Sequence, residues 1–145
     1  MKRRIMGIPI LLLAVLLMGC GQKLDGIREL RTEQVERIEV YTGGVPMDAR
    51  RKTVTDPDEL ESVLSMLRGI RIRREAREDE LLAGALGLGF RVVGRDGSEV
   101  ALWWNDGQVS YEGVRYWGAG GPGDEAAFWK GLSAPEEQAS EEELP

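Results

Sequence analysis

The chain has 145 residues, of which 19 are Lys or Arg and 25 are Asp or Glu, and its formal net charge is −6 at pH 7. It contains no histidine and a single cysteine, which excludes Ser-His-Asp and Cys-His catalysis and zinc sites built from imidazole or thiolate ligands. The acidic balance argues against nucleic acid as a partner, because such binding neutralises phosphates with Lys and Arg.

The first nineteen residues have the features of a bacterial export signal. Three basic residues follow Met1, and no charged side chain occurs between Ile5 and Gly19. This apolar stretch is shorter than the ~20 residues that a membrane-spanning helix needs, which favours a secretory signal. Cys20, the only cysteine, follows the stretch directly.

The sequence LMGC, from Leu17 to Cys20, resembles the lipobox of bacterial lipoproteins. The resemblance implies cleavage between Gly19 and Cys20, a diacylglyceryl group on the Cys20 thiol, and often acylation of the new amino terminus. Two or more acyl chains anchor a protein stably, at ~0.8 kcal/mol per buried methylene group. An ordinary signal peptide and an uncleaved anchor helix are the alternatives. We therefore predict a lipoprotein on the extracytoplasmic face of the cell membrane, or in the outer membrane if the envelope is Gram-negative.

The remainder of the chain is long enough for one domain. The signal holds three of the 19 basic residues and no acidic ones, so the other 126 residues carry a net charge of −9. A chain of this size can bury a core without disulfides or metal. We predict a signal peptide over residues 1–19, a lipidated tether over 20–34, an α+β domain over 35–132 and an acidic disordered tail over 133–145.

The domain is predicted to begin with two strands and a helix. Apolar and charged residues alternate over residues 35–42 before two glycines, and a second, weaker strand covers residues 50–55. The helix over residues 56–68 has Asp56 as its N-cap, Pro57 in its first position, and Glu59 placed to complete a capping box.

One face of this helix is apolar. Leu60, Val63, Leu64 and Leu67 follow the helical period and form a stripe that can cover a sheet. Gly69 is predicted to end the helix in the left-handed conformation.

Five arginines fall between Arg68 and Arg77, in a strand that starts at Ile70 and in the charged loop after it. They could bind anionic lipid or wall polymer. Acidic residues follow at once, however, and charged side chains commonly protect an exposed strand edge. We therefore favour a solvated sheet edge.

The apolar pattern determines the register of a meander in the second half of the chain. One apolar face comprises Leu86, Leu88, Phe90 and Val92, and the next strand offers Val100, Leu102 and Trp104. For these faces to meet, Val92 must lie opposite Val100, which requires a three-residue loop with Gly97 in the left-handed conformation. A two-residue turn at residues 106–107 then keeps Trp104 opposite Val109.

This register places Trp104 in the core and Trp103 on the opposite, polar face. The same face carries Arg91, Glu99, Ala101, Ser110 and Glu112. Because a large aromatic side chain in water contributes nothing to folding, we interpret Trp103 as the mark of a docking surface. Trp103, Arg91 and Ser110 are the candidate contact residues, and sugar stacking is the alternative role for the tryptophan.

A short helix near residues 124–132 is predicted to close the domain. The predicted fold is thus α+β, an antiparallel sheet in the order strand, strand, helix, meander and short helix, with the main helix packed on one face. VERIEVYTGG, TVTDPDELESVLSMLRGI and the meander resemble, in pattern, small lipoproteins of Gram-positive, spore-forming bacteria. That likeness implies no activity.

The predicted function is a non-catalytic, membrane-anchored module that binds a protein or supports an assembly of the envelope. Carboxylates gather at the start of the main helix, where the helix dipole accounts for them, and no catalytic or metal-site pattern is present in the sequence. We expect no metal and no cofactor apart from the covalent lipid. A binder of wall polymer or carbohydrate is the alternative, and a small carboxylate-based hydrolase is less favoured.

Overall fold

The computed structural model describes residues 22–43, 48–81 and 87–145. Its strands are β1 Gln22–Lys23, β2 Val35–Thr42, β3 Arg50–Val54, β4 Arg71–Glu75, β5 Leu88–Gly94, β6 Glu99–Asn105, β7 Gln108–Tyr111, β8 Val114–Ala119 and β9 Glu137–Gln138. Its helices are α2 Asp25–Arg28, α3 Pro57–Arg68 and α4 Glu125–Gly131, with short 3-10 turns η1 Thr32–Gln34, η3 Glu78–Glu80 and η4 Glu141–Glu143.

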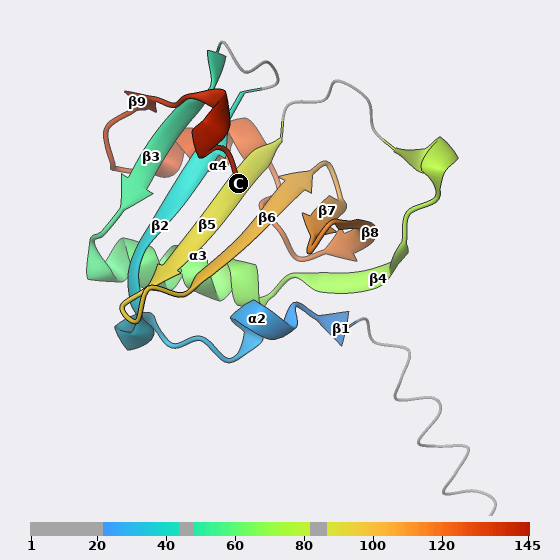
Figure 1. Cartoon of the computed structure of the whole chain (residues 1–145), viewed down its shortest axis with the longest axis horizontal. Helices are drawn as coiled ribbons and strands as arrows, with labels where there is room; N and C mark the ends of the chain where they lie inside the picture. Colours follow the sequence, from blue (N-terminus) through green and yellow to red (C-terminus); the bar gives the residue numbers. More distant parts are fainter. Residues whose placement is uncertain (1–21, 44–47, 82–86) are drawn as a thin grey trace, which may run out of the picture.

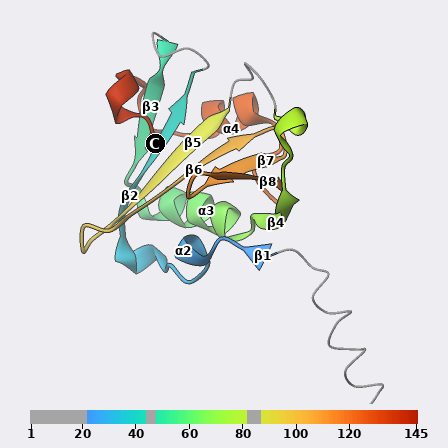
Figure 2. The same cartoon turned by 45° about the vertical axis from the view of Figure 1, so that its right-hand side comes forward.

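Within the described residues the strands form one nine-stranded sheet. Its order is β1-β4-β8-β7-β6-β5-β2-β3-β9, and each pair of neighbours is antiparallel. Helices α3 and α4 lie on the same side of this sheet in both views (Figures 1 and 2). This small domain, mostly sheet with a few helices, fits the predicted α+β class.

The two faces of the sheet differ in what covers them. On one side, the helix face, Ile38 and Val40 of β2 and Phe90 of β5 are fully buried. They share one buried cluster with the apolar stripe of α3, which comprises Leu60, Val63, Leu64 and Leu67. Phe128 of α4 meets Phe90 edge-on, with ring centroids 5.9 Å apart. On the other side, the tail face, residues 137–145 return to the sheet.

The start of α3 follows the sequence prediction in part. The Asp56 carboxylate accepts hydrogen bonds from the backbone N–H groups of Asp58 and Glu59, at 3.1 and 3.0 Å, so the predicted N-cap is confirmed. The predicted capping box is wrong, because Glu59 does not bond back to Asp56. Its carboxylate instead accepts from the backbone and hydroxyl of Ser133, at 3.2 and 2.5 Å, and so ties the start of α3 to the segment after α4.

Gly69 ends α3 as predicted, but not in the left-handed conformation. Its φ is −79°, and its N–H donates to the carbonyls of Ser65 and Met66. The last turn tightens in this way because Ile70, the next residue, is fully buried and leads directly into β4. No reversal of the chain is needed there.

The register predicted for the meander is confirmed. Val92 lies opposite Val100, and Trp104 lies opposite Val109. A shift of one residue would exchange the two faces, so the apolar pattern specifies this pairing strongly. Leu86, which was assigned to the same apolar face, lies outside the described residues.

The turns of the meander also have the predicted lengths. Gly94 N–H donates to the carbonyl of Ser98, which leaves a three-residue loop in which Gly97 has a φ of +84°. Asp106 and Gly107 both have positive φ, at +43° and +86°, as a two-residue hairpin turn of this twist requires.

The predicted tether is wrong for the residues that the structure describes. Leu24 and Ile27 are 1% and 0% exposed and belong to the main core. The backbone N–H of Gly26 donates to the hydroxyl of Tyr111 at 3.1 Å, which fastens α2 to the sheet. Three apolar residues, Leu24, Ile27 and Leu30, are too few to produce a strong periodic pattern, so the sequence does not mark this segment as part of the domain.

The predicted disordered tail is also wrong. In β9, Glu137 pairs with Arg51 of β3, and Ala139 is 4% exposed, with its N–H 2.9 Å from the carbonyl of Ala49. A run of glutamates looks solvated in isolation. Here it meets the arginines of β3, so its charge is used in contacts with the sheet.

The burial of α2 makes a test of the domain boundary. We expect Ile27→Ala to lower the free energy of unfolding by ~2–5 kcal/mol, as for other buried aliphatic side chains. Asp25→Ala, an exposed change in the same helix, should alter it by less than about 0.5 kcal/mol. Urea unfolding of the purified variants measures both. Equal, small effects would place α2 outside the core.

Candidate functional site

The predicted contact residues lie on one face of the sheet, the tail face. Arg91 lies opposite Ala101 in the neighbouring strand, and Trp103 lies opposite Ser110. On the other flank of β5, Arg91 lies opposite Glu39 of β2. The structure therefore places the three candidate contact residues on one face of the sheet, but their surroundings differ.

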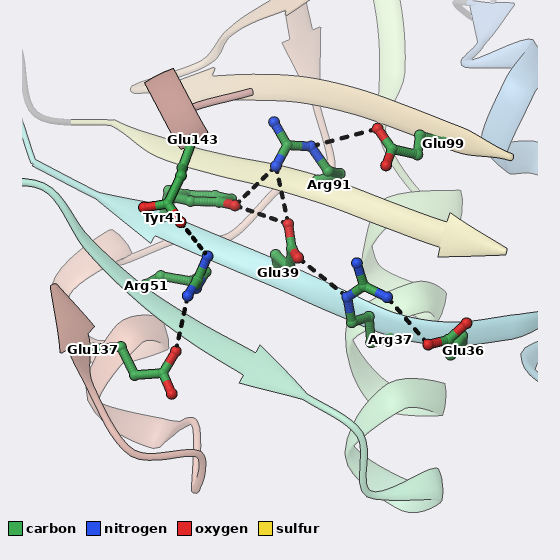
Figure 3. Close-up of polar contacts among 9 residues, drawn as sticks. All are labelled: Glu36, Arg37, Glu39, Tyr41, Arg51, Arg91, Glu99, Glu137 and Glu143. Carbon is green, nitrogen blue, oxygen red and sulfur yellow. Dashed lines mark hydrogen bonds and ion pairs between the residues drawn. The ribbon is translucent and has the colours of Figure 1, made fainter. Parts of the chain in front are cut away.

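Arg91 belongs to a buried network around Glu39 (Figure 3). One oxygen of the Glu39 carboxylate accepts from the Tyr41 hydroxyl at 2.8 Å and from Arg91 Nη1 at 3.0 Å. The other oxygen accepts from Arg37 Nε at 3.1 Å. Arg91 also lies over the Tyr41 ring, 5.6 Å from its centroid. Both oxygens of a carboxylate that is only 7% exposed are thus satisfied.

This network holds its members in their ordinary charge states. Burial raises the pKa of Glu39, but hydrogen bonds from Tyr41, Arg37 and Arg91 outweigh it and leave the pKa below its usual value. Burial, followed by the hydrogen bond to Glu39, raises the pKa of Tyr41. Glu39 therefore stays ionised and Tyr41 protonated at neutral pH. Arg91, predicted as a contact residue, is engaged here in holding the sheet face together.

The tail is fastened beside this network. Arg51 of β3 pairs with Glu137 at 3.1 Å and with Glu143 at 3.3 Å, on opposite sides of its guanidinium (Figure 3). Ala139 packs in a second buried cluster with Tyr41 and Ala49. The tail face is therefore partly covered by the chain itself.

Trp103 is half-buried, which corrects the expectation that it stands free in water. Its indole N–H donates to the carbonyl of Pro145 at 2.8 Å. Its ring lies over Gly89, where an added Cβ would come within 2.9 Å of the ring and 3.1 Å of Pro145. A glycine opposite the tryptophan thus leaves room for both. The sequence could not indicate this cover, because it depends on a residue 42 positions away.

A groove of about 510 Å³ opens next to Trp103 and Pro145. The residues that shape its wall and floor include Glu99, Ala101, Trp103, Ser110, Glu112 and Pro145. Two of the three predicted contact residues, Trp103 and Ser110, therefore line one groove, and Arg91 does not. Sequence reasoning placed Glu112 on the face of Trp103 without naming it as a contact residue, and it missed Pro145. Glu112, in the turn after β7, follows from the confirmed hairpin register, whereas no sequence signal marks Pro145.

The groove presents both aromatic and polar groups. It combines an aromatic side chain, the Ser110 hydroxyl and the carboxylates of Glu99 and Glu112. Arg115 Nε donates to the Ser110 hydroxyl at 3.3 Å and orients it. Such a surface suits a chain segment with basic and apolar groups, or a sugar polymer.

A second groove, of about 450 Å³, lies between the β6–β7 turn and α4. Its carboxylates have structural contacts: Asp124 accepts from the N–H of Ala127 at 2.9 Å, and Glu125 from the N–H of Asp106 at 2.8 Å. Across the described ranges, no group of three or more Cys, Asp or Glu side chains is placed to hold a metal ion.

No family model, no curated protein and no solved structure matches this chain. The function must therefore be inferred from its residues and their geometry. Gly19 and Cys20 lie outside the described residues. In the part of the chain that the structure describes, no helix is long and apolar enough to cross a membrane.

The acidic tail should leave the sheet in acid. Hydrogen bonds from Trp129 and Arg50 lower the pKa of Glu136, and those from Ser140, aided by Arg51, lower the pKa of Glu143. A glutamate whose pKa is lower in the docked tail than in the unfolded chain stabilises the docked tail fully at pH values above its unfolded pKa, about 4.3. This stabilisation is lost as the pH falls through the lower pKa of the docked state. The Trp103 indole N–H resonance, which reports the bond to Pro145, should shift in this acid range.

A matched pair of variants separates this effect from general unfolding. At neutral pH, Glu143→Gln should weaken tail docking, while Glu142→Gln, an exposed neighbour, should leave it unchanged. Amide signals of β5 report whether the domain stays folded. The explanation by ion pairs would be contradicted if the indole signal responded equally to the two variants. It would also be contradicted if the signal responded to acid only when β5 unfolds.

Proposed function

We propose that this protein is a bacterial lipoprotein, anchored through diacylglyceryl-modified Cys20 on the extracytoplasmic face of the membrane. The observation that carries the proposal is the position of the only cysteine, within LMGC and directly after an uncharged stretch. The fold supports it, because the described core begins at Leu24, four residues beyond Cys20. Cleavage before Cys20 would leave that core intact.

We further propose that the domain is a non-catalytic binding module. In this view α3 covers one face of the sheet, and the groove beside Trp103 on the tail face is the contact surface. Its open shape and its carboxylates, Glu99 and Glu112, support a partner segment with basic groups. An envelope protein of this kind is the favoured partner, and no cofactor beyond the lipid is invoked.

A wall polymer is the second candidate. The observation that favours it is the position of the Trp103 ring beside the Ser110 hydroxyl and two carboxylates in one groove. Aromatic rings stack on sugar rings, and carboxylates accept hydrogen bonds from sugar hydroxyls. The same groove therefore suits a glycan.

The anchor is tested by the mass of the protein extracted from membranes. We expect acyl chains on an amino-terminal Cys20, because that residue is the only thiol in the chain. Cys20→Ala should abolish the acyl mass and leave the signal uncleaved or the domain released. Ser98→Ala, an exposed change in the domain, is the control and should keep the lipid. An unmodified amino terminus at another residue would overturn the lipoprotein proposal.

The groove is tested by photocrosslinking in native membranes. A photoreactive residue at Glu112, on the rim of the groove, should capture a partner, and one at exposed Lys130 on α4 should not. Trp103→Ser should abolish capture. Ala101→Arg, which fills the groove without removing Trp103, should abolish it as well and guards against loss through unfolding.

Two outcomes separate the candidates. If a protein is captured, and Trp103→Ser and Ala101→Arg each abolish that capture, the protein-binding module is supported. If instead the domain is retained on purified cell wall, and each substitution abolishes that retention, the wall-polymer alternative is supported. Partner capture that neither substitution changes would place the contact surface elsewhere.

A further inference from the structure

The first strand determines where the proposed lipid anchor leaves the domain. β1 begins two residues after Cys20, and Gln22 in it lies opposite Ile72 of β4. An extended residue spans at most ~3.6 Å, and paired strands lie about 4.8 Å apart. The Cα atom of Cys20 must therefore lie within about 12 Å of β4. Acyl chains on Cys20 would hold this edge of the sheet at the level of the lipid headgroups.

That edge is basic in an acidic protein. Strands β1 and β4 together contain four basic residues, Lys23, Arg71, Arg73 and Arg74, and one acidic residue, Glu75. Arg74 is paired with Glu80 at 2.7 Å. Arg71 and Arg73 are exposed, and no carboxylate among the described residues lies within ion-pair distance of them. Their charge is available to an outside anion.

The opposite edge of the sheet is acidic. β9 is the last strand in the order that begins with β1, and both views show the two strands at opposite ends of the molecule (Figures 1 and 2). The segment that contains β9 and η4 carries five glutamates, Glu136, Glu137, Glu141, Glu142 and Glu143. Arg50 and Arg51 pair with three of them, so the segment stays acidic.

We propose that the β1–β4 edge docks on anionic lipid headgroups, so that the anchored domain stands on this edge with its acidic tail directed away from the bilayer. The inference rests on the lipid anchor proposed above. The net negative charge of the domain does not oppose it, because exposed charges farther than about 8 Å are largely screened at physiological salt. A merely solvated edge would show no dependence on lipid charge.

The size of the effect follows from two arginines. A basic residue at an anionic leaflet strengthens the attraction about five-fold, so Arg71 and Arg73 together should shift the orientation equilibrium about thirty-fold. Arg71→Gln with Arg73→Gln should remove this shift. Arg95→Gln with Lys130→Gln removes the same charge from exposed positions in the β5–β6 loop and on α4, and serves as the matched control.

The experiment uses the full lipidated chain in vesicles that carry a headgroup quencher. Because acylation consumes the only cysteine, Ala76→Cys just after β4 and Glu141→Cys in the tail each provide one free thiol for a fluorophore. Vesicles of phosphatidylcholine alone are compared with equal parts of phosphatidylcholine and phosphatidylglycerol. We expect stronger quenching at position 76 in the anionic vesicles than in the neutral ones, with the increase removed by high salt and by the Arg71/Arg73 change, and little quenching at position 141 in either.

The outcomes distinguish this inference from the lipid anchor itself. A chain that floats with neither kind of vesicle and carries no acyl mass overturns both. Suppose that the chain floats with both kinds of vesicle, but quenching at position 76 does not depend on lipid charge or on the Arg71/Arg73 change. This result overturns only the proposal that the β1–β4 edge docks on anionic lipid. If the two arginines affect only retention on purified cell wall, the edge serves an anionic wall polymer and the lipid proposal is wrong.

Discussion

The buried carboxylate of Glu39 determines what the tail face of the sheet must contain. Glu39 lies in β2, between β5 and β3, so it cannot reach water around an edge. An ion that is buried without partners costs several kcal/mol, and removing one partner of a buried pair commonly costs ~3–5 kcal/mol. The cations of Arg37 and Arg91 and the Tyr41 hydroxyl are therefore required together. Once they are in place, the face is rigid and polar, and the tail can pack beside it.

Two consecutive residues of β3 fasten the two covers of the sheet. Arg51 points to the tail face and holds Glu137 and Glu143. Lys52 points to the helix face, where its buried ammonium donates to the carbonyls of Trp129 and Leu132 at 2.8 and 3.0 Å. These carbonyls lie at the end of α4, where a positive charge is favourable. Because successive side chains of a strand point to opposite faces, adjacent residues of β3 bind the helix layer on one side and the tail on the other.

The parts of the fold that could be predicted are those with local rules. Val92 and Trp104 reveal their partners through the period of two along a strand, and Gly97 and Gly107 reveal their turns through the need for positive φ. The Asp56 cap is local in the same sense. Leu24 and Ala139 were missed because their burial depends on residues far along the chain, and Glu59 was misassigned because Ser133 competes for it.

The same distinction between local rules and distant contacts applies to the residues of the candidate site. The face of Trp103 and its proximity to Ser110 follow from register alone, so both could be placed on that face from the sequence. The role of Arg91 could not, because alternation suggested a solvated strand face around Glu39, not a buried one. Pro145 was missed for a third reason. Backbone carbonyls leave no trace in sequence patterns, yet one of them binds the Trp103 indole.

The contact between Trp103 and Pro145 restricts how the chain can be extended in the laboratory. Residues fused after Pro145 would start at the groove, which Pro145 lines together with the Trp103 indole and the acidic side chains of Glu99 and Glu112. A polyhistidine tag placed there would bring imidazoles and, when loaded, metal ions to those carboxylates. An affinity handle inserted at Gly123, in the loop between β8 and α4, where an added Cβ meets nothing within 4 Å, leaves the residues that line this groove unchanged.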